Sequence, residues 1–129
     1  MDVNAGSVAR YADMLAAMGS EARLRIVRLL LAAHPAGLYV GEIQRELGIP
    51  ASTLSHHLDK LKHEGLIGVR REQRNLRYTA SSETLSELLG FLYAECCSRS
   101  GAVEPSRLVA IASADVAPPL QVQGEKKDA

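Results

Sequence analysis

Two short amphipathic segments separated by only three residues constrain the fold of this chain more than any other feature. In each segment apolar residues recur every three or four positions, which is the spacing of one face of a helix. These residues are Val40, Ile43 and Leu47 in VGEIQREL (40–47), and Leu54, Leu58 and Leu61 in ASTLSHHLDKLKHEG (51–65). Gly48-Ile49-Pro50 breaks the first helix, and Gly65 is suited to end the second. The sequence therefore predicts a helix, a tight turn and a second helix.

A basic segment follows this pair of helices. Residues 66–70 (LIGVR) and 76–80 (LRYTA) alternate between apolar and polar side chains, and the polar segment 71–75 joins them, which predicts a β-hairpin. The whole chain has a net charge of zero, but residues 51–80 hold six Lys or Arg against three Asp or Glu, and three of the four histidines. Such a local concentration of positive charge is what a DNA-binding surface requires.

Helical spacing also predicts helices on both sides of this central region. The first spans 8–18, the second follows Ser20 as N-cap and ends at Pro35, and the last begins at Ser81 or Ser82 and runs through Cys97. Their expected apolar stripes are Val8, Tyr11, Ala12, Leu15 and Met18; Leu24, Val27, Leu30 and Leu31; and Leu85, Leu88, Leu89, Leu92 and Cys96. The expected fold is mainly α with a β-hairpin, in the order α-α-α-α-β-β-α over residues 1–101. Residues 102–129 are expected to form a partly disordered tail, with a helical turn or two at 108–112.

Several broad classes of protein are not expected from this sequence. No apolar run reaches the roughly 18 residues of a membrane span, and the N-terminal segment lacks the basic and apolar regions of a signal peptide. Two cysteines do not make a disulfide scaffold, so we expect a cytoplasmic protein. The sequence shows no nucleophile–base pair, phosphate loop or metal-ligand triad, so an enzyme is not expected.

A helix-turn-helix pair followed by a basic hairpin is the arrangement of a winged helix-turn-helix. There the second helix enters the major groove of DNA, and flanking cations contact phosphates. The candidate DNA-binding residues are Ser52, Thr53, Ser55, His56, Lys60 and His63 on the helix, and Arg70, Arg71, Arg74 and Arg77 on the hairpin. Each alone is also what a solvated helix or hairpin carries, but their order and spacing together favour DNA. His57, at the edge of the apolar face, is expected to pack or to cap.

Three stretches carry a family pattern: AMGSEARLRIVRLLLA (17–32), GLYVGEIQRELGIPASTLSHHLDKLKHEGLI (37–67) and VRREQRNLRYTA (69–80). With them, residues 12–97 resemble the ArsR/SmtB family of bacterial metal-sensing repressors. The resemblance implies a homodimer, built on the first and last helices, that binds double-stranded operator DNA and releases it when an inducer binds. The apolar stripes of both terminal helices agree with a dimer, because a single small domain cannot bury all of them.

The resemblance also implies an inducer site, for which the family offers several positions. Tyr39 and Gly41 stand where one arsenic-sensing pattern has cysteines, so that site is absent. The zinc pattern needs histidines on the last helix, and none lies between Ser81 and Cys97. Some members that respond to arsenic or its methylated form carry adjacent cysteines at the end of the last helix, as Cys96 and Cys97 do here. A trivalent arsenic species is therefore the expected inducer at this pair, and no obligatory cofactor is expected.

Two thiolates narrow the choice of arsenical. Trivalent arsenic is thiophilic, and arsenite or antimonite has three exchangeable positions whereas methylarsenite has two. Some members add a third cysteine a few residues on, where this chain has Ser98, Ser100 and Gly101. Adjacent helical residues point about 100° apart, so chelation requires the helix end to unwind. Three alternatives stay open: a structural pair in a non-sensing module, a redox or persulfide sensor, and a site for Cd(II), Hg(II) or Cu(I).

Overall fold

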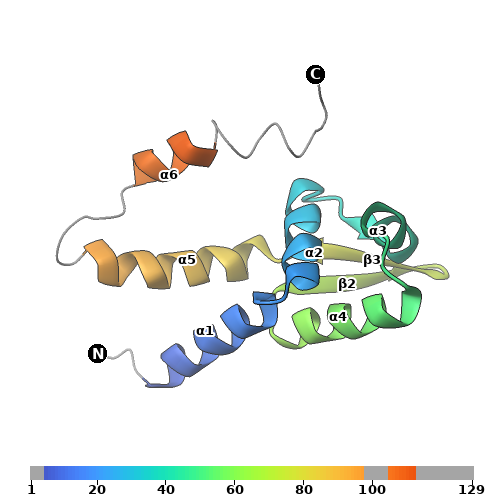
Figure 1. The fold of residues 1–129 in the computed structure, drawn as a ribbon, viewed down its shortest axis with the longest axis horizontal. Helices are drawn as coiled ribbons and strands as arrows, with labels where there is room; N and C mark the ends of the chain where they lie inside the picture. The colour runs from blue at the N-terminus through green and yellow to red at the C-terminus, as the bar shows by residue number, and fades with distance from the viewer. Residues whose placement is uncertain (1–4, 98–104, 113–129) are drawn as a thin grey trace. The chain divides into compact units, whose positions relative to one another are not determined.

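The computed structural model describes residues 5–97 and 105–112 (Figure 1). The helices are α1 (Ala5–Met18), α2 (Glu21–Ala32), α3 (Val40–Leu47), α4 (Ala51–His63), α5 (Ser82–Cys97) and α6 (Pro105–Ile111); the strands are β1 (Leu38–Tyr39), β2 (Ile67–Glu72) and β3 (Asn75–Ala80). The chain divides into two compact units, Met1–Ser86 and Glu87–Ala129, and α5 begins in the first and continues into the second. The predicted start of a tail after residue 101 lies outside the described residues.

The expected fold class is confirmed, because helices surround a small antiparallel hairpin. The predicted helix at 40–47 is α3, and Gly48 ends it with a φ of 64°. The second predicted helix is α4, whose apolar stripe packs against α1, α2 and β2. Leu54, Leu58 and Leu61 are each at most 1% exposed, so this stripe forms part of the core of the first unit.

The sequence did not predict β1. This two-residue strand pairs with β3 in an antiparallel sheet of order β1-β3-β2, with Leu38 opposite Tyr78. Gly37, directly before it, has a φ of 80°, and a Cβ there would collide with the backbone oxygen of Tyr78 and with Thr79. A glycine is therefore required where the chain enters the sheet. Two residues are too few to show any periodicity, which is why the pattern gave no signal.

The hairpin of β2 and β3 is longer than predicted. Arg71, Glu72 and Asn75 were expected in a five-residue connector, but they belong to the strands, and Glu72 pairs with Asn75. Only Gln73 and Arg74 form the turn, and Gln73 has a φ of 60°. The strand ends extend into solvent and carry polar side chains on both faces, so alternation could not mark where pairing stops. In Figure 1 the tip of this hairpin projects beyond the N-terminal end of α4.

The predicted core face of α2 is wrong in part, and α1 buries residues outside its predicted apolar stripe. In α2 the buried residues are Ile26, Val27 and Leu30, whereas Leu24 and Leu31 are exposed. In α1 the residues that enter the core are Met14 and Ala17, and the predicted stripe at Val8 and Leu15 is exposed. Both helices are apolar on more than one face, so spacing alone does not identify the face that packs within one chain. The remaining core residues of the first unit are Ile43, Leu66, Ile67, Tyr78 and Ala80.

The predicted helix ends are largely confirmed. Ser20 caps α2 by accepting a hydrogen bond from the Arg23 amide at 3.4 Å, and Ser81 accepts one from the Thr84 amide at 3.2 Å. The helix that begins there, α5, runs to Cys97 as predicted. Among the described residues, none of the helices is long and apolar enough to cross a membrane.

Candidate nucleic-acid interface

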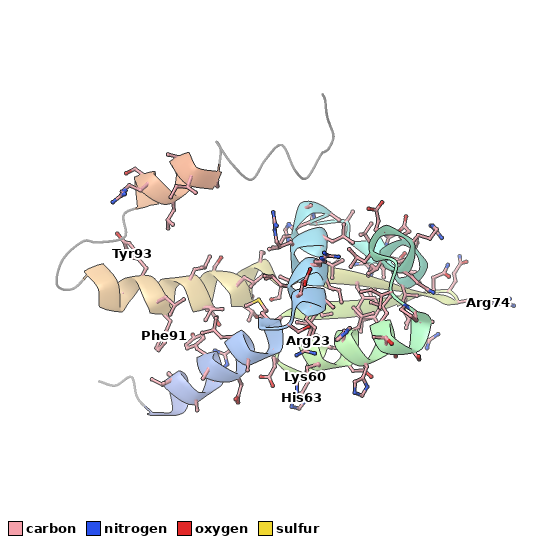
Figure 2. The ribbon with its side chains drawn as sticks, viewed as in Figure 1. Arg23, Lys60, His63, Arg74, Phe91 and Tyr93 are labelled. Carbon is pink, nitrogen blue, oxygen red and sulfur yellow. The ribbon has the colours of Figure 1, made fainter. Side chains whose placement is uncertain are left out.

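The outer face of α4 presents the six candidate DNA-binding residues of this helix to solvent. Ser52, Thr53, Ser55, His56, Lys60 and His63 are all exposed. Figure 2 shows Lys60 and His63 on the side of α4 that is turned away from β2. The leucines on the opposite side are fully buried and fix the rotation of the helix about its axis, so the outer face cannot turn inward without opening the core.

A shallow, open depression of about 370 Å³ lies on the C-terminal half of this face. It is lined by His56, Asp59, Lys60, His63 and Glu64. The two carboxylates make this surface mixed in charge, unlike a simple phosphate-binding patch. Acidic side chains accept hydrogen bonds from the exocyclic amino group of cytosine, whereas cations bind guanine or phosphate. The depression therefore offers chemistry for base edges as well as for the backbone.

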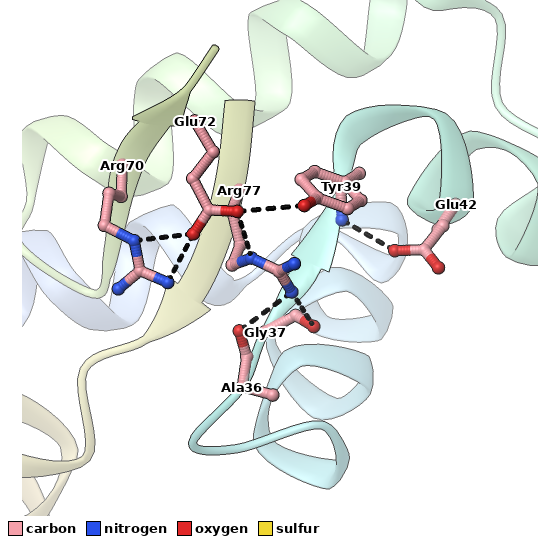
Figure 3. A network of polar contacts seen from close by, with 7 residues as sticks. All are labelled: Ala36, Gly37, Tyr39, Glu42, Arg70, Glu72 and Arg77. Carbon is pink, nitrogen blue, oxygen red and sulfur yellow. Dashed lines mark hydrogen bonds and ion pairs between the residues drawn. The ribbon is translucent and has the colours of Figure 1, made fainter. Parts of the chain in front are cut away.

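One carboxylate, Glu72 at the last strand pair before the turn, organises the hairpin (Figure 3). Glu72 accepts hydrogen bonds from Arg70 Nε at 2.8 Å, from the Tyr39 hydroxyl at 2.9 Å and from Arg77 Nε at 3.1 Å. Arg77 also donates to the carbonyl oxygens of Ala36 and Gly37, and its guanidinium lies 4.1 Å from the centre of the Tyr39 ring. The hydrogen bonds from Arg70, Tyr39 and Arg77 lower the pKa of Glu72 to about 2. Together they tie β1 to the hairpin.

The four hairpin arginines consequently fall into two groups. Arg77 is held by Glu72 and only 21% of its side chain is exposed, while Arg70 is paired with Glu72 but 64% exposed. Arg71 and Arg74 are exposed, and within the described part of the chain neither side chain forms a hydrogen bond or an ion pair. Arg74 lies at the tip of the hairpin (Figure 2). Arg71 and Arg74 are thus the arginines most readily available to phosphate.

The sequence did not identify Glu72, Tyr39 or Arg23 as residues of this region. Glu72 stands among arginines in the sequence, and that alternation of charge was the one available signal of an internal ion-pair network. Tyr39 is 33 positions away from Glu72 along the chain, so only the fold brings them together. His57 was expected to pack or to cap; it is half-buried, and its Nδ1 lies 3.2 Å from the guanidinium of Arg23.

The proposed inducer site is described only in its backbone. Cys96 and Cys97 are the last two residues of α5. Their side chains, and all of Ser98, Ser100 and Gly101, lie outside the described residues. Among the side chains that are described, no group of three or more His, Cys, Asp or Glu is arranged to hold a metal ion.

The fold and the polar outer face of α4 define a winged helix-turn-helix protein. Residues 18–70 match a protein family described as a helix-turn-helix domain. The transcriptional activator HlyU of Vibrio cholerae is 35% identical over 89 residues, which are 69% of this chain and 80% of that protein. A solved structure of HlyU covers 70% of this chain and 99% of its own, with a TM-score of 0.57 and 36% identity. A relative of Halobacterium salinarum that covers 68% of this chain at 30% identity carries the name ArsR2. The chain belongs to the ArsR family of winged helix-turn-helix transcriptional regulators.

Two other relatives bear on assembly and on the inducer. A homodimeric winged helix-turn-helix DNA-binding domain from Mycobacterium bovis, described as a possible ArsR-family regulator, has a TM-score of 0.60 at 26% identity. It covers 74% of this chain and 86% of its own. A putative arsenical resistance operon repressor of Halobacterium salinarum is 30% identical over 88 residues, which are 68% of this chain and 72% of that protein.

Proposed function

We propose that this protein is a homodimeric repressor that binds operator DNA through α4 and the β2–β3 hairpin and dissociates when a trivalent arsenical binds Cys96 and Cys97. The observation that carries the DNA-binding part is the outer face of α4. Its polar side chains are exposed while Leu54, Leu58 and Leu61 beneath them are buried, so the face is presented rigidly. Arg71 and Arg74 on the neighbouring hairpin supply cations for phosphate.

Dimerisation accounts for apolar surface that one chain leaves exposed. Within the first unit, Val8 and Leu15 of α1 are exposed although the helix also buries Met14 and Ala17. Within the second unit, Leu89 and Leu92 of α5 are exposed. Covering such apolar side chains with a second copy removes them from water, and the two-fold homodimer is the commonest form of soluble oligomer. The homodimeric relative from Mycobacterium bovis supports this arrangement.

The inducer proposal rests on the chemistry of the cysteine pair. Cys96 and Cys97 are the only cysteines in the chain, and thiolates are the preferred ligands of soft trivalent arsenic. Methylarsenite exchanges two hydroxyl groups for two thiols and releases two water molecules, whereas arsenite keeps one position that needs another donor. The pair ends α5, and unwinding the end of a helix that joins two subunits would change the separation of the two α4 helices. The arsenical resistance repressor among the relatives supports this choice.

A single titration series tests the proposal. A fluorescent duplex that the protein has enriched from a random pool is bound, and its anisotropy is followed during addition of methylarsenite, arsenite, Cd(II), Zn(II) or a persulfide. We expect methylarsenite to release DNA at the lowest concentration and both Cys96→Ser and Cys97→Ser to abolish release while leaving DNA affinity unchanged. Ser100→Cys, which adds a third thiol, should lower the arsenite concentration needed. Full release of either serine variant by methylarsenite contradicts the thiol site, and release by a persulfide alone identifies a redox sensor instead.

A further inference from the structure

One guanidinium connects three helices of the first unit. Arg23, in the first turn of α2, lies between α1 and α4 (Figure 2). Its Nε donates a hydrogen bond to the carbonyl oxygen of Ala17 at 2.5 Å, and its Nη1 lies 3.2 Å from Nδ1 of His57 in α4. The Ala17 carbonyl belongs to the last turn of α1, where helical carbonyls lack partners within the helix. Arg23 therefore joins the end of α1 to the middle of α4.

The contact between Arg23 and His57 requires a neutral imidazole. A guanidinium is always charged and can only donate, so Nδ1 must accept and the ring proton must be on Nε2. Burial, and then the charges of Arg23 and His56, lower the pKa of His57. Protonation would place a second donor and a second positive charge against Arg23. The contact would then become repulsive in a partly buried position, where water screens charge poorly.

We propose that Arg23 and a neutral His57 form a positioning contact that holds α4 in the orientation in which its outer face binds DNA. This inference rests on the proposed function, because it concerns the same helix. It adds Arg23 and His57 to the residues that determine DNA affinity, although neither needs to contact DNA. His57 lies between the buried Leu58 and the exposed His56, so displacement of its ring moves the outer face directly. The contact also gives α1, a proposed dimerisation helix, a polar connection to the DNA-binding helix through Ala17.

The surroundings of His57 leave Arg23 as its main charged neighbour. The neighbour of the imidazole ring from α2 is Arg23. The group from α1 is the uncharged Ala17 carbonyl, which accepts a hydrogen bond from Arg23, and α4 itself contributes His56. Two carboxylates of α4 and β2 act on other groups. Burial, and then the charge of Asp59 in α4, raises the pKa of Tyr78. Glu72 of β2, the strand in contact with α4, pairs with Arg70 and Arg77. Acidification therefore weakens the Arg23–His57 contact.

DNA affinity measured against pH separates this positioning role from simple packing. The probe is the enriched fluorescent duplex, titrated with the full-length protein between about pH 8 and about pH 5.5. His57→Gln keeps an acceptor but cannot titrate, and Arg23→Met removes the donor. Every other pH effect on DNA binding is shared by all variants, so only the difference between variants reports on His57. The matched control for His57→Gln is His34→Gln, which alters an exposed histidine after α2. The matched control for Arg23→Met is Arg28→Met, which alters an exposed arginine within α2.

We expect His57→Gln to bind within about threefold of the wild type at pH 8 and roughly fivefold more tightly than the wild type at pH 5.5. Arg23→Met should bind roughly tenfold more weakly at pH 8 and should remove the effect of His57→Gln, as a coupled pair requires. The imidazole ¹⁵N shifts of the wild type should show the Nε2–H tautomer of His57. Identical pH profiles for wild type and His57→Gln, or an Nδ1–H tautomer, overturn the positioning contact while leaving DNA binding intact. Failure of the wild type to enrich any duplex overturns the proposed function itself.

Discussion

Glu72 determines which of the hairpin arginines are available to bind DNA. By accepting hydrogen bonds from Arg70, Tyr39 and Arg77 it converts Arg77 from a DNA-binding candidate into a residue whose guanidinium is already occupied by the protein. The sequence predicted four equivalent arginines because composition and spacing cannot show which cation has an internal partner. Arg77 remains a candidate DNA contact only if DNA displaces Glu72, whereas Arg71 and Arg74 need no such exchange.

Glu72→Gln should lower the melting temperature near neutral pH. The pKa of Glu72 is lowered from 4.5 to about 2 in the folded protein, so the unfolded chain binds the proton more readily. The stabilisation is therefore complete above about pH 4.5 and is lost as the pH falls toward 2. Thermal unfolding of wild type and variant should show a gap at neutral pH that narrows below pH 4.5. The exposed Glu46→Gln is the control, and a gap that does not change with pH would contradict the assigned role.

At the scale of elements, the sequence predicted best where one face alone was apolar. Both α3 and α4 carry a single apolar stripe, and both were located within two residues. The helices α1 and α2 are apolar on two faces, so Leu24 and Leu31 were assigned to a core that in fact receives Ile26. The hairpin was found from alternation, but its turn was placed too wide, and β1 was missed because it depends on pairing with a distant strand. The exposure of the six α4 candidates followed directly from the correct stripe.

The β2–β3 hairpin should contribute phosphate contacts mainly through its unpaired arginines. In a plot of the logarithm of the binding constant against the logarithm of salt concentration, each phosphate contact steepens the slope by about 0.9. If Arg71 and Arg74 each contact one phosphate, Arg71→Gln and Arg74→Gln should each make this slope shallower by that amount. Affinity should fall similarly for all DNA sequences, because phosphates carry no sequence information. The measurement is a set of anisotropy titrations over a range of salt concentrations. Arg28→Gln, on an exposed face of α2, should leave the slope unchanged, and unchanged slopes for both hairpin variants would remove the hairpin from the interface.

At the scale of the whole molecule, the central question is whether the apolar face of α1 pairs with a second copy. The sequence predicted that the terminal helices had more apolar surface than one domain could cover, and the exposure of Val8 and Leu15 agrees with that. The spacing of apolar residues could not show which surface of one subunit contacts which surface of the other, because that depends on how the two subunits assemble. The inducer chemistry was likewise predicted from the two thiols of Cys96 and Cys97, the last residues of α5, and not from helical spacing.

Leu15→Asp should convert a dimer into a folded monomer. Leu15 is 45% exposed, so the charge is solvated in a single chain but would be buried between two. Light scattering after gel filtration should give a mass near 13.9 kDa for the variant and twice that for the wild type. Leu24→Asp is a closely matched control, since Leu24 is 46% exposed but lies on α2, and it should remain dimeric. A wild type that is monomeric at micromolar concentration, or a dimeric Leu15→Asp, would show that α1 is not the interface.

Selection of DNA from a random pool tests most directly the claim that a dimer reads DNA with α4. The wild type should enrich a two-fold symmetric motif whose half-sites are about 10 base pairs, or a multiple of that distance, apart. A Ser52→Ala/His56→Ala variant should lose preference at the base pairs that α4 contacts, whereas Arg74→Gln should keep the motif and bind it more weakly. Enrichment of no motif by the wild type, or of the same motif with undiminished preference by the α4 variant, would contradict DNA recognition by this helix.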